Sequence, residues 1–159
     1  MELDRARDAL CTGQTLLLDQ NELALAAPRI ALGRGIAGLE AAQDHLTQFL
    51  RSAGCHKRIL YRAEIVVKET VANIRQHGER ADRPARAWVE AWIGDQRAVI
   101  AVEDDGPPFD PMRLMKAPPN GSADAGRGMR VIRRNTDDVR YIRTQTGRNR
   151  LELHIGLNG

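Results

Sequence analysis

The stretch Glu69-Thr-Val-Ala-Asn73-Ile-Arg-Gln-His77-Gly78 decides the fold, because it closes a helix predicted from about Lys57 to Gln76. At about 100° per residue, Glu69, Asn73 and His77 fall within an arc of roughly 80°. The opposite face is apolar and carries Leu60, Ala63, Val67, Val71 and Ile74. The helix can therefore bury one face in a core and leave a polar face free, which suits either the floor of a ligand site or a solvated surface.

The polar face also has the residue types that phosphoryl transfer needs. Glu69 can accept a proton from an attacking hydroxyl, and the amide oxygen of Asn73 is a hard, neutral ligand for Mg²⁺. Polar stripes on surface helices show the same pattern without any chemistry. Motifs further along the chain have to decide between these two interpretations.

The second motif is Asp104-Asp-Gly106-Pro-Pro-Phe109, which follows a strand predicted over Ala98 to Val102. An Asp at a strand end can accept a hydrogen bond from an exocyclic amine such as that of adenine. The glycine after it lets the backbone approach the ring. Asp, Gly and Pro are equally common in ordinary turns, so both interpretations stay open at this motif.

The third motif is Gly126-Arg127-Gly128-Met129, where a helix is predicted to begin at about Gly128. Its glycines allow backbone N–H groups to face an anion at the helix N-terminus, where the helix dipole also favours negative charge. A flexible loop end has the same composition. The long segment before this motif, which holds Pro118-Pro119-Asn120-Gly121-Ser122, is predicted to be a mobile lid.

The remaining chain predicts an α+β fold: a two-layer sandwich with helices on one face of a mixed, mostly antiparallel sheet. Trp88 and Trp92 share one face of a predicted strand and are expected to cover the core. Leu16-Leu17-Leu18 could form an edge strand, a short surface helix or an interface. Besides the helix over Lys57 to Gln76, a helix is predicted over Gly35 to Ala53 and a strand over Glu22 to Ala27, with Ile30 to Leu32 as its possible continuation. Two hairpins are also predicted. The first joins the strands Ala87 to Ile93 and Ala98 to Val102, and the second joins Val139 to Thr144 and Arg150 to Ile155.

Composition is that of one globular domain: 159 residues, 42% hydrophobic and 28% charged. We assign residues 1–20 to an extension of unknown role and 21–159 to the domain.

The net charge is only +3 and aromatic residues make up 4%, so we expect no direct contact with nucleic acid. The chain also has no apolar run of membrane length and no signal peptide, so we expect a cytoplasmic protein without membrane association.

Together, the three motifs resemble the nucleotide-binding boxes of the histidine-kinase-like ATPase (GHKL) fold, the group that includes gyrase, histidine kinases and MutL. The order and the spacing of the motifs both agree. Within that group the chain looks most like the small anti-sigma-factor serine kinases, over roughly residues 22 to 155. Asp138-x-x-Tyr141 and Gly147-x-Asn149-x-Leu151 add to this resemblance. The chain departs from the family pattern at two places. Pro107-Pro108 stands where the broader fold often has a second glycine, and Ile74 stands where a small residue is common.

The resemblance implies a role for each matching position near the helix. Glu69 would be the general base that deprotonates a serine hydroxyl, and Asn73 would hold Mg²⁺ between the phosphates of ATP. His77 would line the site near the metal or the phosphates. Asp104 would read the adenine amine, with Gly106 beside it.

At the third motif, Gly126 and Gly128 would form the hinge of the lid and cradle the phosphates, with Met129 in the same nucleotide-binding stretch. Arg127 is our own addition to this set. A cation beside the phosphate loop could stabilise the charge of the transferring group, and a solvent-facing arginine is the alternative.

The function implied by the resemblance is a serine protein kinase in a partner-switching pathway that regulates transcription. Such a kinase binds Mg-ATP, holds a sigma factor or another regulator, and phosphorylates a STAS-type antagonist protein on serine. A homodimer is expected from the family. The alternative is a nucleotide-gated binding module that sequesters its partner without phosphoryl transfer. The chain length disfavours a detached histidine-kinase domain and the larger enzymes of the group.

Overall fold

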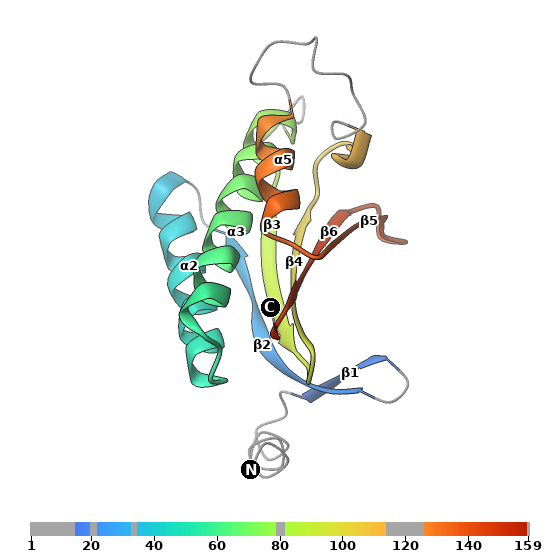
Figure 1. Cartoon of the computed structure of the whole chain (residues 1–159). Coiled ribbons are helices and arrows are strands. Elements are labelled where there is room, and N and C mark those ends of the chain that lie inside the picture. The colour runs from blue at the N-terminus through green and yellow to red at the C-terminus, as the bar shows by residue number, and fades with distance from the viewer. Residues whose placement is uncertain (1–14, 20–21, 33–34, 79–81, 114–125, 159) are drawn as a thin grey trace.

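The computed structural model describes residues 15–19, 22–32, 35–78, 82–113 and 126–158. Three helices and six strands are found there (Figure 1). The predicted lid segment falls largely on residues 114–125, which lie outside the described residues. In chain order, the elements are β1 (Thr15–Asp19), β2 (Glu22–Leu32), α2 (Gly35–Ser52), α3 (Lys57–His77), β3 (Ala87–Ile93), β4 (Arg97–Asp104), α5 (Arg127–Arg134), β5 (Asp138–Arg143) and β6 (Asn149–Gly156).

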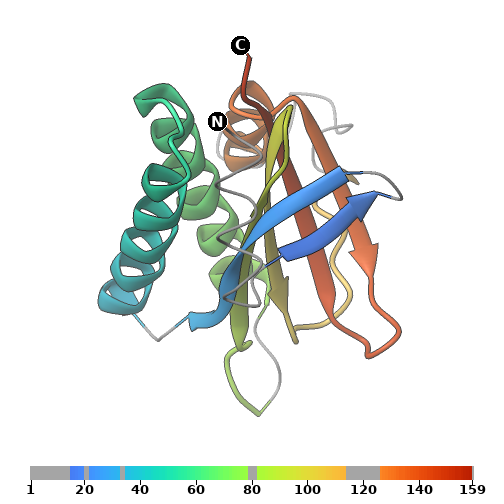
Figure 2. The same ribbon diagram turned by 90° about the horizontal axis from the view of Figure 1, so that it is seen from below.

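The strands form one sheet in the order β1-β2-β3-β4-β6-β5. Every neighbouring pair is antiparallel, so the described sheet has no parallel pair, where a mixed, mostly antiparallel sheet was expected. All three described helices cover the same face of this sheet (Figures 1 and 2). The predicted α+β two-layer architecture is confirmed. No helix in the described part of the chain is long and apolar enough to cross a membrane.

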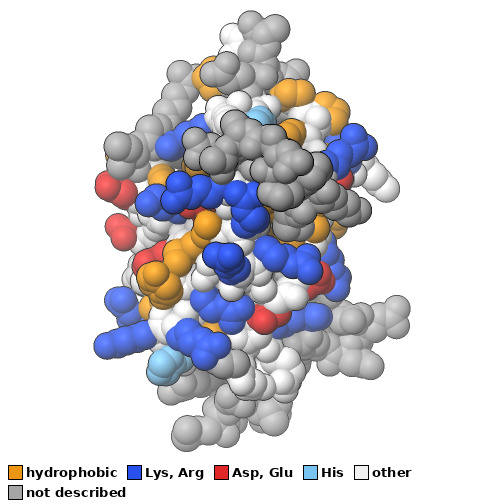
Figure 3. Space-filling view, turned by 45° about the horizontal axis from the view of Figure 1, so that its top comes forward, with side chains coloured by type: hydrophobic (Ala, Val, Ile, Leu, Met, Phe, Trp, Pro, Cys, Tyr) orange, Lys and Arg blue, Asp and Glu red, His pale blue; other side chains and the backbone are white. Residues whose placement is uncertain are grey.

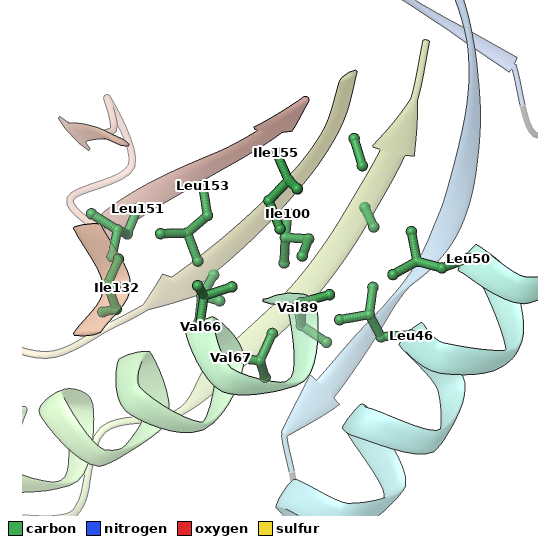
Figure 4. Close-up of a cluster of buried hydrophobic side chains, with 14 of the residues drawn as sticks. Leu46, Leu50, Val66, Val67, Val89, Ile100, Ile132, Leu151, Leu153 and Ile155 are labelled. Carbon is green, nitrogen blue, oxygen red and sulfur yellow. The ribbon is translucent and has the colours of Figure 1, made fainter. Parts of the chain in front are cut away.

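The main hydrophobic core fills the space between the helices and the sheet (Figure 4). The apolar face predicted for α3 lies in this core, where Ala63, Val66 and Val67 are at most 1% exposed. Val89, Ile100 and Leu153 reach the same core from the central strands, and Ile132 does so from α5. Burial of the apolar stripe leaves the polar stripe of α3 free for other contacts.

The other face of the sheet carries charged residues and both tryptophans. Because side chains alternate along β3, Val89, Ala91 and Ile93 face the main core, and Trp88 and Trp92 face away from it. The expectation that the tryptophans cover the core is therefore wrong for the main core. Trp92 belongs to a small second cluster, and the guanidinium of Arg148 lies 4.3 Å from the ring centroid of Trp88.

At the N-terminal edge of the sheet, Leu16-Leu17-Leu18 belongs to an edge strand, which settles a point that the sequence left open. Strand β1 pairs with β2, although residues 15–19 fall within the segment assigned above to an extension. Strand β2 continues through Pro28 to Leu32, and its register against β3 shifts between Ala27 and Ile30. The shift accommodates a proline, which cannot donate to a ladder of hydrogen bonds.

Candidate functional site

A pocket of about 420 Å³, open to solvent, lies between α3 and the ends of the central strands. We call it the α3 pocket. It contains Asn73, His77 and Asp104, so the structure brings together members of the first two sequence motifs. Ile74, which replaces the small residue common at this position in the family, also lines the wall. The full lining consists of Thr70, Asn73, Ile74, His77, Gly78, Val102, Asp104, Phe109, Pro111, Tyr141, Asn149 and Leu151.

Two glycines explain how α3 and the end of β4 come so close. A Cβ atom on Gly106 would lie 3.0 Å from the Cα of Gly78 and 2.7 Å from Oδ1 of Asp104. A Cβ atom on Gly78 would lie 2.4 Å from the carbonyl oxygen of Ile74, which accepts the N–H of Gly78 at the end of the helix. Gly106 is therefore required by the contact between these two backbones, and Gly78 is required by the carbonyl oxygen at the end of its own helix.

Asp104 lies at the end of β4 and is 7% exposed. Its Oδ1 atom accepts hydrogen bonds from Nδ2 of Asn149 at 2.9 Å and from the N–H of Gly106 at 2.8 Å. Burial raises the pKa of this carboxyl group, and the two hydrogen bonds only partly oppose that effect. A buried carboxylate at a pocket wall can accept a hydrogen bond from an amine of a ligand. We call Asp104, Gly106 and Asn149 the strand end of the site.

His77 takes its place in the α3 pocket through a ring contact. Its imidazole stacks on the ring of Phe109, with 4.4 Å between centroids and 17° between planes. Along the helix, His77 lies about 12 Å from Glu69, because eight residues rise about 1.5 Å each. The structure thus sets His77 beside the strand end, and away from the carboxylate that the resemblance makes the catalytic base.

The loop before β3 is clamped to the strand end by Asp105. The guanidinium of Arg83 donates two hydrogen bonds to this carboxylate, at 2.8 and 3.1 Å, and Arg86 donates its backbone N–H and its Nε. Burial alone would raise the pKa of Asp105. The hydrogen bonds from Arg83 and Arg86 outweigh burial and hold the pKa well below its ordinary value.

Glu69 and Asn73 meet the third motif where α5 begins. A Cβ atom on Gly128 would lie 3.1 Å from Oε2 of Glu69 and 3.2 Å from Oδ1 of Asn73. Gly126 is the N-cap of α5 and has a φ of 78°, a left-handed conformation that glycine adopts without strain. We call Glu69, Asn73, Gly126 and Gly128 the helix end of the site. Here a carboxylate and an amide oxygen face the positive end of a helix dipole.

The two other residues of the third motif differ in their surroundings. Met129 is fully buried, and its Sδ accepts a hydrogen bond from Nδ2 of Asn73 at 3.4 Å. Its side chain belongs to the core, so the part of Met129 available to a ligand is the backbone N–H. Arg127 is exposed, and its side chain makes no hydrogen bond or ion pair with any residue that the structure describes.

Arginines also cover the outer surface of α5. Arg130, Arg133 and Arg134 are exposed along with Arg127, so half of this eight-residue helix is arginine. Blue Lys and Arg side chains gather across the middle of the side of the molecule seen in Figure 3. Positive charge on the helix that borders the site favours the approach of a polyanionic ligand.

The helix end also fits a magnesium ion that is bound together with phosphates. The amide nitrogen of Asn73 is engaged with Met129, whereas its Oδ1 atom accepts no hydrogen bond from the described residues. Among those residues there is no cluster of three or more His, Cys, Asp or Glu side chains that could hold a metal alone. Mg²⁺ commonly takes one or two protein oxygens and completes its shell with phosphate and water oxygens, which agrees with this donor set.

Sequence reasoning did not assign Phe109, Tyr141 and Asn149 to the site, although all three occur in the quoted motifs. Phe109 provides the ring contact to His77, and Asn149 provides the hydrogen bond to Asp104. Tyr141 lies on β5, one strand beyond Asn149 on β6. The available signal was the position of Asn149 immediately before a predicted strand, but its partner lies 45 residues earlier in the chain.

Comparison with protein families gives one clear match. The family model described as "Histidine kinase-like ATPase domain" matches residues 35–155. No curated protein sequence matches at a significant level. The matched range contains every residue of the strand end and of the helix end.

Two solved structures share the fold. The SiaB-SiaC complex from Pseudomonas aeruginosa contains a chain with a TM-score of 0.59 and 16% identity, and the match covers 97% of each chain. The RsbU and RsbW domains of Rv1364c from Mycobacterium tuberculosis give a TM-score of 0.55 at 17% identity, over 80% of this chain. The match spans only 32% of that mycobacterial chain. At these identities the likeness concerns the fold alone.

Proposed function

The chain belongs to the family of histidine kinase-like ATPase domains, and from this premise we propose that it is a serine protein kinase of the anti-sigma-factor type. The family implies nucleotide binding. The observation that carries the proposal is the position of Glu69, whose carboxylate lies beside Asn73 at the first turn of α5. A domain that only binds a nucleotide has no need of a carboxylate at that place.

In this proposal the nucleotide lies along α3. Asp104 accepts a hydrogen bond from the exocyclic amine of adenine, with the backbone of Gly106 beside the ring. His77 and Phe109 form the apolar border of the base site, which departs from the metal or phosphate neighbourhood expected for His77. The phosphates then extend towards Gly126 and Gly128, where backbone N–H groups at a helix N-terminus stabilise negative charge.

The proposed transfer step uses Glu69 as the base. The hydroxyl oxygen of a serine on the partner protein bonds to the γ-phosphorus while its proton moves to Glu69. The bond from the γ-phosphorus to the bridging oxygen breaks, and ADP leaves. The backbone N–H groups of Gly128 and Met129, with the guanidinium of Arg127, would stabilise the charge that develops on the transferring group.

Asn73 is the residue proposed to hold Mg²⁺, through the Oδ1 atom that no described group occupies. When bound, the ion neutralises charge on the phosphate oxygens. The hydrogen bond from Nδ2 of Asn73 to Met129 keeps the oxygen directed away from the sulfur. The side chain is therefore oriented before any ion arrives.

The proposed partner is a STAS-type antagonist protein that accepts the phosphoryl group, and the proposed target of regulation is a sigma factor or another regulator of transcription. The SiaB-SiaC structure supports this proposal, because a domain with this fold occurs there in a complex. We further propose that the chain forms a homodimer in the cytoplasm and needs neither nucleic acid nor a membrane.

The test is the transfer of radioactive label from γ-labelled ATP to purified STAS-domain proteins. The wild type is compared with Glu69→Gln, which keeps the size of the side chain and removes the base. Loss of general-base catalysis is expected to slow transfer by about 10²- to 10⁴-fold. The matched control is Glu64→Gln, an exposed glutamate on the same helix whose Oε1 atom accepts a hydrogen bond from Thr47. This control should transfer label at the wild-type rate.

Two results would contradict parts of the proposal. Transfer by Glu69→Gln at the wild-type rate would remove the base from the mechanism. A wild type that binds ATP but labels no STAS-domain protein would instead favour the nucleotide-gated binding module. Nucleotide binding is measured separately by calorimetry, so a failure to bind is not mistaken for a failure to transfer.

A further inference from the structure

Asn149 is the most highly connected polar side chain in the wall of the α3 pocket. It is 6% exposed, and its Oδ1 atom accepts three hydrogen bonds. Two come from β5, from Oη of Tyr141 at 2.8 Å and from Nη1 of Arg143 at 2.8 Å. The third comes from the backbone N–H of Phe109 at 3.3 Å. All three partners are donors at this atom.

The amide nitrogen of Asn149 meets only acceptors. It donates to Oδ1 of Asp104 and to the carbonyl oxygen of Pro107, both at 2.9 Å. The reversed amide would set its NH₂ group against three donors and its oxygen against two acceptors. The surrounding network therefore fixes the orientation of this side chain.

This orientation determines what Asp104 can offer a ligand. Two donors, Nδ2 of Asn149 and the N–H of Gly106, occupy Oδ1 of the carboxylate. Oδ2 has no hydrogen-bond donor among the described residues and remains an acceptor. A purine with a 6-amino group can donate to it, whereas a 6-oxo group would bring two acceptors together in a largely buried place.

We propose that Asn149, held by Tyr141 and Arg143, is a positioning residue that makes the pocket select a 6-amino purine nucleotide over a 6-oxo one. It does so by fixing Asp104 as a hydrogen-bond acceptor. This inference rests on the proposed binding of a nucleotide in the α3 pocket, and it adds the residues that set the selectivity for the base.

The variant Asn149→Asp isolates this role. It keeps the shape of the side chain and an acceptor for Tyr141 and Arg143, but it sets a carboxylate oxygen against Asp104. At pH 8 the two carboxylates repel, and ATP should bind about tenfold or more weakly than to the wild type. At pH 6 a proton shared by the two carboxyl groups replaces the lost N–H donor, so the affinity for ATP should recover.

Other ionisable groups face the same place and need a control. His77 reaches the pocket from α3, Tyr141 and Arg143 reach it from β5, and Asp105 follows Asp104 in the chain. All four are present in both proteins. Subtracting the wild-type profile of affinity against pH therefore removes their contribution, and only the coupled pair of carboxyl groups remains.

The experiment is calorimetric titration of the full chain with Mg-ATP and with Mg-ITP, which differ in the group at the 6 position of the purine. The wild type should prefer ATP by about tenfold or more. Asn149→Asp should lose most of this preference at pH 8, and Tyr141→Phe should lose part of it. The control Arg140→Gln, at an exposed residue of β5 that pairs with Asp138, should keep the wild-type preference.

Each result has a distinct meaning. If the wild type binds neither nucleotide, the proposed function fails and this inference fails with it. If the wild type prefers ATP and both variants keep that preference, only the inference is overturned. Should Asn149→Asp not fold, Tyr141→Phe decides the matter, because it removes a single hydroxyl group that donates to Asn149.

Discussion

The strand end and the helix end of the site differ in how completely their polar groups are paired. At the strand end, Asn149 makes five hydrogen bonds and Asp104 accepts two. At the helix end, the side chain of Glu69 makes no hydrogen bond or ion pair with any described residue, and the side chain of Asn73 donates only to Met129. One part of the site is ordered before a ligand arrives, and the other keeps its oxygens available.

This difference matches the two tasks in the proposed reaction. Recognition of a base gains from groups that are already fixed, because less ordering is needed on binding. A base and a metal ligand instead need oxygens that are not saturated by other donors. Variants that affect one end and spare the other are therefore the sharpest tests of the comparison.

The largest effect is expected from removing the carboxylate of the strand end. At an ATP concentration of about one hundred times the Kd, the wild type should gain about 2.7 kcal/mol in free energy of unfolding from Mg-ATP. Asp104→Ala should gain almost nothing, whereas Glu69→Gln should gain as much as the wild type. Thermal unfolding with and without Mg-ATP measures this. Equal gains in all three proteins would show that the two ends do not divide binding and chemistry.

A smaller effect is expected from glycine substitutions that compare the packing of the two ends. Gly106→Ala brings a methyl group against the backbone of Gly78, so the free energy of unfolding should fall by about 2 kcal/mol. Gly128→Ala meets side-chain oxygens of Glu69 and Asn73 and no backbone atom, and alanine favours helix, so its stability should stay within about 1 kcal/mol of the wild type. Urea denaturation of both variants gives the answer. Similar losses in both would contradict the difference in packing.

The smallest effect concerns acid. The pKa of Asp105 lies below its value in the unfolded chain, which is about 3.9. Its stabilising contribution is therefore fully present above that value and is lost as the pH falls through the lower pKa of the folded state. Arg86 is largely exposed, so solvent screens its ion pair with Asp105. We therefore expect Asp105 to contribute only about 1 kcal/mol to the free energy of unfolding.

The measurement is the free energy of unfolding at pH 5 and at pH 2.5. The wild type should lose about 1 kcal/mol more than Asp105→Asn over this interval. A parallel decline in both proteins would mean that the clamp by Arg83 and Arg86 adds no stability to the strand end.

Much of the fold followed from local patterns in the sequence. The period of 3.6 residues assigned Glu69, Asn73 and His77 to one face of a helix, and burial of the opposite face confirmed that helix. The four strands predicted for the two hairpins differ from the observed ones by at most two residues at each end, as for Arg97–Asp104. Such patterns are local, because a neighbour three or four residues away creates them.

The sequence could not decide which face of the sheet the tryptophans occupy. Trp88 and Trp92 alternate with Val89 and Ala91, so both faces of β3 look apolar. Similarly, Leu16-Leu17-Leu18 allowed several structures until β2 provided a strand to pair with. In both cases the deciding partner lies on another element.

What the sequence determined by itself was the set of reactive groups, namely the acid, the amide and the glycines in their order. What the tertiary structure decided was which of them meet. Gly128 meets Glu69 across 59 positions, and Asn149 meets Asp104 across 45. Contacts of this kind depend on sheet register and helix packing. A residue records its own local preference, whereas the register is fixed only when all strands and helices bury their apolar faces together.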